Sequence, residues 1–552
     1  MALFLGLDCS TQSMTGVVIQ SDDANSTFAV LASASCQFDQ TLPHYGTSNG
    51  VLIHDGHVEV PSLMLVEALD IMLEDLRVAL EKTSHSFSEI KAVSGSGQQH
   101  TTVFWHHDSL EMPTVGLLSA FFKEKNVFFP PNGRSWMDSS TTKYCRQLEE
   151  ALGGAQRVAD LTGSRAYERF TGIQLLSLGE IDQVSRVSIV SSMLTSLFRG
   201  EYSPIDRSDA SGMNLMDIRS RKWSPEVLDA IEKINGPRKS TLTRYLINDP
   251  VPSHKSLGGI APYFTKNYSF SPDCAVIPFS GDNPCTLAGM GLSQPGDIGI
   301  SLGTSGCVFA VGSSDDIQPS GSEGHVFVNP IDTSTYMAML CYKNGSLARE
   351  NVRNRRADSN WETFSRLMEQ SPPGNNGYLG FFFLQPEITP VVPAESESQT
   401  LSGIYGYDSQ GKPVDFSELP PEVEVRAIVE WQCLSMYYYT QKLYRGVMKR
   451  LIVGGGASAN QTLLDTIANV YNAPVYVEVS RVNTAALGGA LRAQHGYNCS
   501  LQEADQPFNP AVTWELKAVP NENIHAVYKE ILGRFAELEA KSIQSQVERF
   551  GA

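Results

Sequence analysis

The sequence predicts an α/β protein built from two similar halves that hold a ligand between them. Two distant segments, residues 5–19 and 298–311, share one pattern, in which two β-rich runs flank a polar turn. Aligned without gaps, Leu5-Gly6-Leu7 matches Ile298-Gly299-Ile300. Two hairpins of one design, one in each half of the chain, indicate a duplicated domain.

The back half of the chain supports the α/β class. A long helix is predicted over residues 423–450 and is followed by an apolar strand at 451–453. A helix over 462–472, a strand at 475–477 and a helix over 484–493 come next. Such a β-α-β-α run predicts a sheet that is at least partly parallel.

Length and composition limit the class of protein. With 552 residues, the chain is long enough for several domains, and we expect a division into residues 1–275 and 276–552. A net charge of -18 argues against a nucleic-acid partner. The nine cysteines show no short paired spacing, which favours reduced thiols in the cytosol over disulfides or a zinc site. We expect no signal peptide and no membrane span, and either a monomer or a homodimer.

The stretch at the middle of the chain carries the first candidate for chemistry. An apolar run over residues 275–279 ends at Ser280-Gly281-Asp282 and is followed by a helix-like segment, residues 285–290. Asp282 is therefore expected at the carboxyl end of a buried strand, where α/β sheets place their ligands. A carboxylate there can act as general base on a hydroxyl. The alternative from this stretch alone is that Asp282 or Asn283 caps the helix.

The first hairpin turn is a candidate phosphate site. Its residues Ser10, Thr11, Gln12 and Ser13 are four hydrogen-bond donors in a row, although such residues also form ordinary turns. In the alignment of the two hairpins Thr11 matches Thr304, and Asp8 matches Ser301. The first hairpin therefore brings a carboxylate that could hold a metal, and the second brings only donors.

Two glycine-rich turns extend the site. A helix over 61–81 precedes a strand at 90–94, which leads through glycines into Gln98-Gln99-His100. These amide and imidazole side chains at a strand end suit a hydroxyl-rich ligand. The alternative is that His100 is structural, as a lone histidine more often is. The three glycines of residues 454–456 follow a strand and allow a phosphate or an adenine to approach closely, with a tight turn as the alternative. Residues 106–134 are expected to form a loop-like insertion or lid.

Taken together, these elements resemble the FGGY family of carbohydrate kinases, which are built on the actin/hexokinase-like (ribonuclease H-like) ATPase fold. The resemblance spans residues 3 to 495, in family order, and is carried by Gly6 to Ser13, Gln98 to His100, Trp136 to Asp138, Gly281 to Pro284, Leu302 to Ser305 and Gly454 to Asn460. It implies two domains with a ligand cleft between them, and ATP and Mg²⁺ as cofactors.

The resemblance also implies a role for each matching residue. Asp282 would be the general base, and Asp8 would hold Mg²⁺, through water. The sugar would be bound by Gln99, His100, Arg169, Asp282 and Asn283. The ATP phosphates and adenosine would be bound by Ser10, Thr11, Gln12, Gly303, Thr304, Trp361, Gly455, Gly456, Ala457 and Asn460.

Residues 162–172, 208–215 and 280–284 resemble the eukaryotic branch of the family that phosphorylates D-xylulose, and imply this ketopentose as the sugar. Gln99 stands where bacterial members often have methionine. Two other readings stay open: a kinase for another polyol such as ribulose or glycerol, and a sugar-binding or regulatory protein that no longer transfers phosphate.

Overall fold

The computed structural model describes residues 1–22, 27–178, 183–236, 242–392, 403–479, 482–508, 510 and 512–550. Its first large sheet has the strand order β10-β6-β1-β2-β3, with β11 also pairing with β6. The strands are β1 (Ala2–Cys9), β2 (Ser13–Asp22), β3 (Thr27–Gln37), β6 (Ile90–Gly97), β10 (Ala275–Val276) and β11 (Ser280–Gly281). β1 and β2 pair antiparallel, which confirms the first hairpin, while β6 runs parallel to β1, β10 and β11.

Helices cover this sheet. The predicted helix over 61–81 is confirmed as α2 (Ser62–Glu81), which packs on β2 and β3, and α7 (Val190–Arg199) packs on β6. The same half contains α1 (Phe38–Thr41), α3 (Leu118–Lys125), α4 (Thr142–Leu152), α5 (Ala155–Thr162), α6 (Thr171–Ser177), α8 (Arg207–Ala210), α9 (Pro225–Asn235) and α10 (Pro262–Tyr268). It also contains the short strands β4 (Leu52–His54), β5 (His57–Pro61), β7 (Thr102–Trp105), β8 (Asn132–Arg134) and β9 (Arg186–Ile189).

The second large sheet has the order β14-β15-β13-β12-β19-β20-β21. Its strands are β12 (Asp297–Leu302), β13 (Gly306–Gly312), β14 (His325–Val328), β15 (Tyr336–Tyr342), β19 (Arg450–Gly454), β20 (Val475–Glu478) and β21 (Trp514–Ala518). β12 and β13 pair antiparallel, which confirms the second hairpin. β19 runs parallel to both β12 and β20, so the predicted partly parallel sheet is also confirmed.

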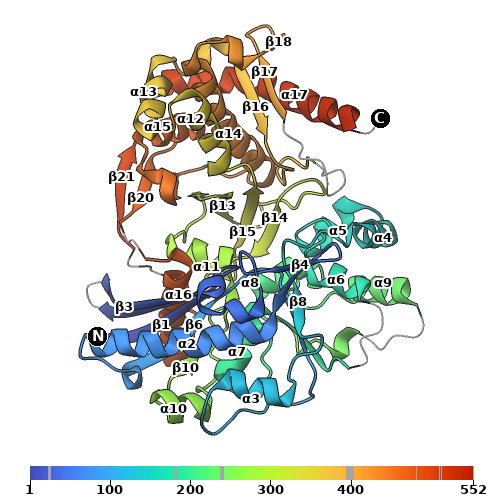
Figure 1. Cartoon of the computed structure of the whole chain (residues 1–552), viewed down its shortest axis with the longest axis vertical. Coiled ribbons are helices and arrows are strands. Elements are labelled where there is room, and N and C mark those ends of the chain that lie inside the picture. The colour runs from blue at the N-terminus through green and yellow to red at the C-terminus, as the bar shows by residue number, and fades with distance from the viewer. Residues whose placement is uncertain are drawn as a thin grey trace.

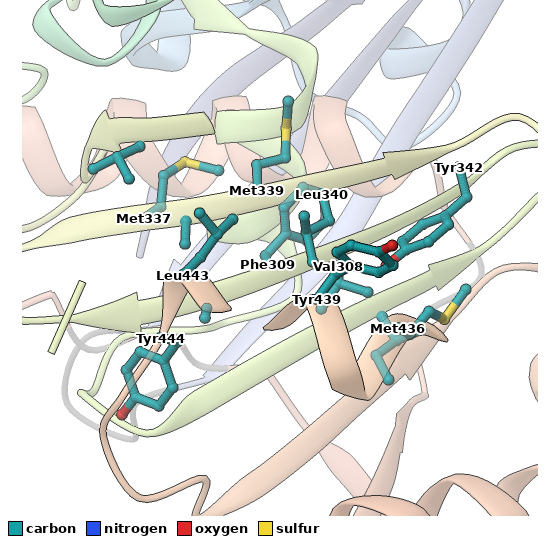
Figure 2. Packing of buried hydrophobic residues seen from close by; sticks show 14 of the residues in the cluster. Val308, Phe309, Met337, Met339, Leu340, Tyr342, Met436, Tyr439, Leu443 and Tyr444 are labelled. Carbon is teal, nitrogen blue, oxygen red and sulfur yellow. The ribbon is translucent and has the colours of Figure 1, made fainter. Parts of the chain in front are cut away.

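The helix α14 (Pro421–Leu443) packs its apolar side chains on this second sheet. Figure 2 shows Met436, Tyr439 and Leu443 of this helix beside Val308 of β13 and Leu340 of β15. All five side chains are buried. Other helices and strands of this half are α12 (Ser346–Arg356), α13 (Trp361–Gln370), α15 (Gln461–Tyr471), α17 (Glu522–Phe550), β16 (Leu379–Phe383), β17 (Gly403–Tyr407) and β18 (Pro413–Val414).

One helix from late in the chain belongs to the first sheet in space. In Figure 1, α16 (Thr484–Gln502) reaches down from the upper half to lie beside β1 and β6, and it also packs on α11 (Asp282–Gly289). A Cβ on Gly6 would lie 2.0 Å from the carbonyl oxygen of Ala486, so only glycine allows this close approach. Because β11 and α11 also join the first sheet, residues on both sides of position 275 build it, and the division of the chain at that position stays a prediction.

Four predicted segments differ from the structure. The sequence pattern of residues 351–369 predicts one helix, but the structure has two, α12 and α13. Asp358 and Ser359 between them adopt left-handed backbone angles, with φ of 50° and 57°. The helix predicted to reach residue 450 ends at Leu443. The loop expected over 106–134 contains α3 and β8, which pairs with β5. The Pro- and Glu-rich composition of residues 385–422 predicts a loop. Residues 393–402 of this segment lie outside the described part, and β17 and β18 follow them.

No helix in the described ranges combines the length and the apolar character that crossing a membrane requires.

Candidate active site

Asp282 is the first residue of α11 and directly follows the strand β11. No side chain caps this helix, whose preceding residue is Gly281, so the capping alternative is not what the structure shows. Instead the Asp282 carboxylate accepts a hydrogen bond of 2.9 Å from the backbone N–H of Asn283. A Cβ on Gly281 would lie 2.2 Å from the side chain of Gln99, which shows how closely the two turns pack.

The surroundings of Asp282 favour a protonated carboxyl group. Burial raises its pKa to about 7, and the negative charge of Asp8 adds to the shift. The backbone N–H groups of Asn283 and Gln99 act in the opposite direction. A carboxylate with a pKa near neutrality is well matched to accept a proton from a substrate hydroxyl.

Asp8 is buried at the end of β1 and is held on both oxygens. Ser96 Oγ donates to Oδ1 at 2.7 Å, and Asn483 Nδ2 donates to Oδ2 at 2.9 Å. Burial raises the pKa of Asp8 and these two hydrogen bonds lower it. Asn483 also caps α16 through its other amide atom, which accepts from Ala486 N at 2.8 Å. Asn483 was not among the predicted site residues, since an asparagine before a helix is an ordinary capping signal.

The surroundings of Asp8 fit Mg²⁺ bound through water. Each carboxylate oxygen has two lone pairs, so one on each remains after the hydrogen bonds to Ser96 and Asn483. Mg²⁺ is usually held by one or two carboxylates together with waters and substrate phosphates. Within the described residues, no group of three or more His, Cys, Asp or Glu side chains is placed to hold a metal, so a cation at Asp8 would depend on nucleotide phosphates.

A chain of side-chain amides links Asp282, through Gln99 in the turn after β6, to Asp209 on α8. Asn283 Nδ2 lies 2.9 Å from Gln99 Oε1 and 3.2 Å from Asp282 Oδ1. Gln99 Nε2 in turn donates to Asp209 Oδ1 at 3.4 Å. Burial raises the pKa of Asp209 to about 7. The structure therefore brings three of the predicted sugar residues together and adds Asp209, which was not predicted as a site residue.

His100 is buried beside them in a left-handed backbone conformation, with φ of 69°. Its Nδ1 lies 2.9 Å from the carbonyl oxygen of Gly212, so Nδ1 carries the proton. Its ring stacks on Phe170 with centroids 4.6 Å apart. Burial and the nearby Arg169 charge hold the pKa of His100 well below its usual value. A neutral ring with a free Nε2 is thereby presented as an acceptor for a hydroxyl.

Arg169 joins the two halves of the protein. Its Nη2 donates to Nε2 of His325, at the start of β14, at 2.7 Å, and its guanidinium stacks on Tyr167 at 4.6 Å. His325 Nδ1 lies 3.1 Å from Ser164 Oγ. Burial and the Arg169 charge keep the pKa of His325 well below normal, so the ring stays neutral and accepts from Arg169. No local pattern pointed to His325, which stands alone before an apolar run.

The two hairpin turns are each fixed by neighbouring segments. In the first turn, Ser10 Oγ donates to the carbonyl of Ser13 at 3.0 Å, and Trp136 Nε1 donates to Thr11 Oγ1 at 2.9 Å, while Gln12 is exposed. In the second turn, the backbone N–H of Ser346 donates to the carbonyls of Gly303 and Thr304 at 3.2 Å each, and the Thr304 side chain is exposed. Among the described residues the two turns make no hydrogen bond with each other.

The predicted adenosine residues lie around the end of β19. Gly455 has a φ of 89°, and a Cβ there would lie 2.6 Å from the carbonyl oxygen of Leu302, so the turn requires glycine. A Cβ on Gly456 would meet no atom within 4 Å, and the short helix over Gly456–Ala459 begins there with Ala457 as its second residue. Asn460 caps α15 and donates from Nδ2 to Ser365 Oγ at 2.8 Å.

The aromatic candidate of this region is Trp361, whose side chain is 38% exposed at the start of α13. The guanidinium of Arg353 covers its ring at 4.5 Å. The structure therefore offers an open glycine turn and an exposed aromatic ring on neighbouring helices. Asn460 has a structural role as a helix cap, whatever its contact with a ligand.

Sequence comparisons identify the class to which this arrangement belongs. Residues 124–289 match the N-terminal domain and residues 298–497 the C-terminal domain of the FGGY family of carbohydrate kinases. Xylulose kinase 2 of Arabidopsis thaliana is 39% identical over 98% of each chain, and xylulose kinase of Rattus norvegicus is 39% identical over 97% of this chain and 96% of that one.

The fold agrees with this result. The crystal structure of ligand-bound xylulose kinase from Lactobacillus acidophilus superposes with a TM-score of 0.77 over 98% of both chains, at 16% identity. The chain belongs to the FGGY family of carbohydrate kinases. The predicted α/β class and its two actin/hexokinase-like domains are thereby confirmed.

Proposed function

We propose that this kinase transfers the γ-phosphate of ATP to the terminal hydroxyl of D-xylulose, giving D-xylulose 5-phosphate and ADP. The observation that carries the proposal is the placement of Asp282, with its pKa of about 7, beside the amides of Gln99 and Asn283. The xylulose kinases that align with this chain over nearly the full length of both proteins support the choice of sugar.

In this proposal the sugar is bound by neutral acceptors and one cation. His100 accepts from a hydroxyl at Nε2, Arg169 donates to the ketose oxygens, and Gln99 and Asn283 bind further hydroxyls. Asp282 takes the proton of the reacting hydroxyl as its oxygen bonds to phosphorus and the bond from phosphorus to the ADP oxygen breaks. Because phosphoryl transfer depends mainly on positioning and charge stabilisation, one general base is sufficient.

The nucleotide lies across both hairpins. Thr11 and Gln12 bind the transferred phosphate from one side, joined by Ser10 when its hydroxyl turns from the carbonyl of Ser13, and Gly303 and Thr304 bind the polyphosphate from the other. Mg²⁺, held through water by Asp8, supplies charge neutralisation for the phosphates. The adenosine is lined by Trp361, Gly455, Gly456, Ala457 and Asn460.

We further propose that the two halves close over the sugar and exclude water, which would otherwise hydrolyse ATP. One contact between the halves supports this step, the hydrogen bond from Arg169 to His325 on the second sheet. Small-angle scattering with D-xylulose and a non-hydrolysable nucleotide should show a smaller radius of gyration than the free protein. An unchanged radius would contradict closure.

We also infer a cytosolic location from the odd number of cysteines and their spacing. A fluorescent fusion confined to an organelle would contradict it.

The test of the reaction is ADP release, coupled to a spectroscopic readout, with Mg-ATP and a panel of acceptors. The panel contains D-xylulose, L-xylulose, D-ribulose, L-ribulose, glycerol, gluconate and 1-deoxy-D-xylulose. Highest kcat/KM with D-xylulose supports the proposal. Preference for another polyol would keep the kinase and change its substrate, and sugar binding without ADP release from any acceptor would favour a regulatory protein.

A further inference from the structure

Two cysteines of the second sheet face each other across neighbouring strands. Cys307 on β13 pairs directly with Cys341 on β15, and their sulfur atoms lie 3.8 Å apart. Both side chains are partly exposed, whereas the other seven cysteines are buried. These two thiols are therefore both close to each other and accessible to a small reagent.

The backbone around this pair suits a disulfide. Residues directly opposite in an antiparallel pair have Cα atoms about 4.5–5.5 Å apart. Disulfides form at Cα separations of about 4.4–6.8 Å, so the strands need no large movement. The two side chains already lie on the same face, and χ1 rotation together with a small shift of the first residues of β13 toward β15 brings the sulfurs together.

The thiol pair is coupled to the proposed active site. Cys307 stands three residues after Thr304, and it also pairs with Ser301 of β12 on its other side. The hydrogen bond from Cys307 raises its own pKa and lowers that of Cys341. The charges of Asp282 and Arg169 also act on both thiols, so the pair lies within their electrostatic reach.

We propose that Cys307 and Cys341 are a reversible oxidation site at which a peroxide closes a disulfide and slows phosphoryl transfer. The thiolate of Cys341 attacks one peroxide oxygen, the O–O bond breaks, and hydroxide leaves, which gives a sulfenic acid. The Cys307 thiol then attacks this sulfur, the S–O bond breaks and water is released. Overall two thiols are oxidised to one disulfide, and one hydrogen peroxide is reduced to two waters.

The expected inhibition follows from the position of the bond. Shortening the contact from 3.8 Å to a bond of about 2.0 Å draws the first residues of β13 toward β15. Gly303 and Thr304 lie in the turn that immediately precedes these residues, so the second phosphate turn is displaced. We expect kcat/KM for the kinase reaction to fall at least tenfold and to recover fully with dithiothreitol.

The test oxidises the reduced full-length protein with hydrogen peroxide and follows two independent readouts. Alkylation and peptide mass analysis should find the peptides of Cys307 and Cys341 linked and the other cysteines alkylated. Loss of ADP release should follow the same time course. The variants C307S and C341S should keep the basal activity and resist inhibition, while the control C36A, with its buried cysteine on β3, should be inhibited like the wild type.

Each outcome tests a separate part of the proposal. Two alkylatable thiols after peroxide, or over-oxidation of one cysteine without linkage, would overturn the disulfide, and the mass readout gives this answer even if the proposed reaction is wrong. A linked pair with unchanged kcat/KM would overturn the coupling to phosphoryl transfer. Inhibition that persists in C307S would assign the effect to another residue and contradict the proposal.

Discussion

Replacing Asp282 by asparagine separates its proposed role as general base from a role in holding the fold. The amide keeps the size of the side chain and can still accept the hydrogen bond that the backbone N–H of Asn283 donates at 2.9 Å. It cannot accept the proton of a sugar hydroxyl. The substitution therefore removes the base and leaves the local hydrogen bonding intact.

The expected loss can be estimated from the chemistry. General-base catalysis contributes about 10²- to 10⁴-fold to the rate. This range corresponds to roughly 2.7–5.4 kcal/mol of activation free energy. We therefore expect kcat of D282N to fall by two to four orders of magnitude, as estimated above, with a small change in the dissociation constant for D-xylulose.

Stability should change in the opposite direction. The pKa of Asp282 is raised from 3.8 to about 7, so between these values the unfolded chain has lost a proton that the folded chain keeps. The free energy of unfolding therefore falls as the pH rises through this interval. Asparagine carries no charge, so D282N should melt at the same temperature as the wild type or higher at pH 7.5.

The measurement pairs single-turnover ADP release with calorimetry of D-xylulose binding and a thermal melt. Wild-type kcat in D282N would refute the general-base argument. A large fall in Tm with retained kcat would show instead that the side chain is structural.

Three further results are expected. Because Asp282 must be unprotonated, log kcat/KM should rise with a slope near one up to about pH 7 and level off above it. Removing the nearby negative charge in D8N should move this rising limb to lower pH. A flat pH profile of the wild type would contradict the assignment. H325A frees Arg169 from its 2.7 Å hydrogen bond, so KM for D-xylulose should rise about 10- to 100-fold with a smaller change in kcat. An unaltered KM would exclude a role of His325 in positioning Arg169. G455A forces a Cβ to within 2.6 Å of the carbonyl oxygen of Leu302, so urea unfolding should show a free energy of unfolding lower by about 1–3 kcal/mol. Calorimetry should show weaker ATP binding. Unchanged values would show that the turn adapts.

Local patterns in the sequence were sufficient for several features. The two hairpins were predictable because alternating apolar residues and a polar turn are local signals that occur twice. The position of Asp282 after a strand and at the start of a helix was predicted correctly. An apolar run that ends at glycine and aspartate is typical of a buried strand followed by a turn. Its role as base stays a prediction.

Other features depend on contacts between distant parts of the chain. Arg169 and His325 are 156 residues apart, and Asp8 and Asn483 are 475 apart. Neither His325 nor Asn483 belongs to a motif, so no local pattern could reveal the contact. The break between α12 and α13 was missed for a different reason: hydrophobic periodicity does not report the left-handed backbone of Asp358 and Ser359.

The packing of α16 against β1 has a consequence for synthesis of the chain. Gly6 has no Cβ, which allows α16 to pack closely on β1. The residues of α16 leave the ribosome only after most of the protein has been made. At about 5–20 residues per second, β1 waits roughly 25–100 s for this partner. During that time the apolar face formed by Phe4, Val17 and Ile19 has no cover from α16. Ribosome-bound chains stalled before residue 484 should therefore bind chaperones and resist protease poorly, so the first sheet to be translated is among the last to be completed.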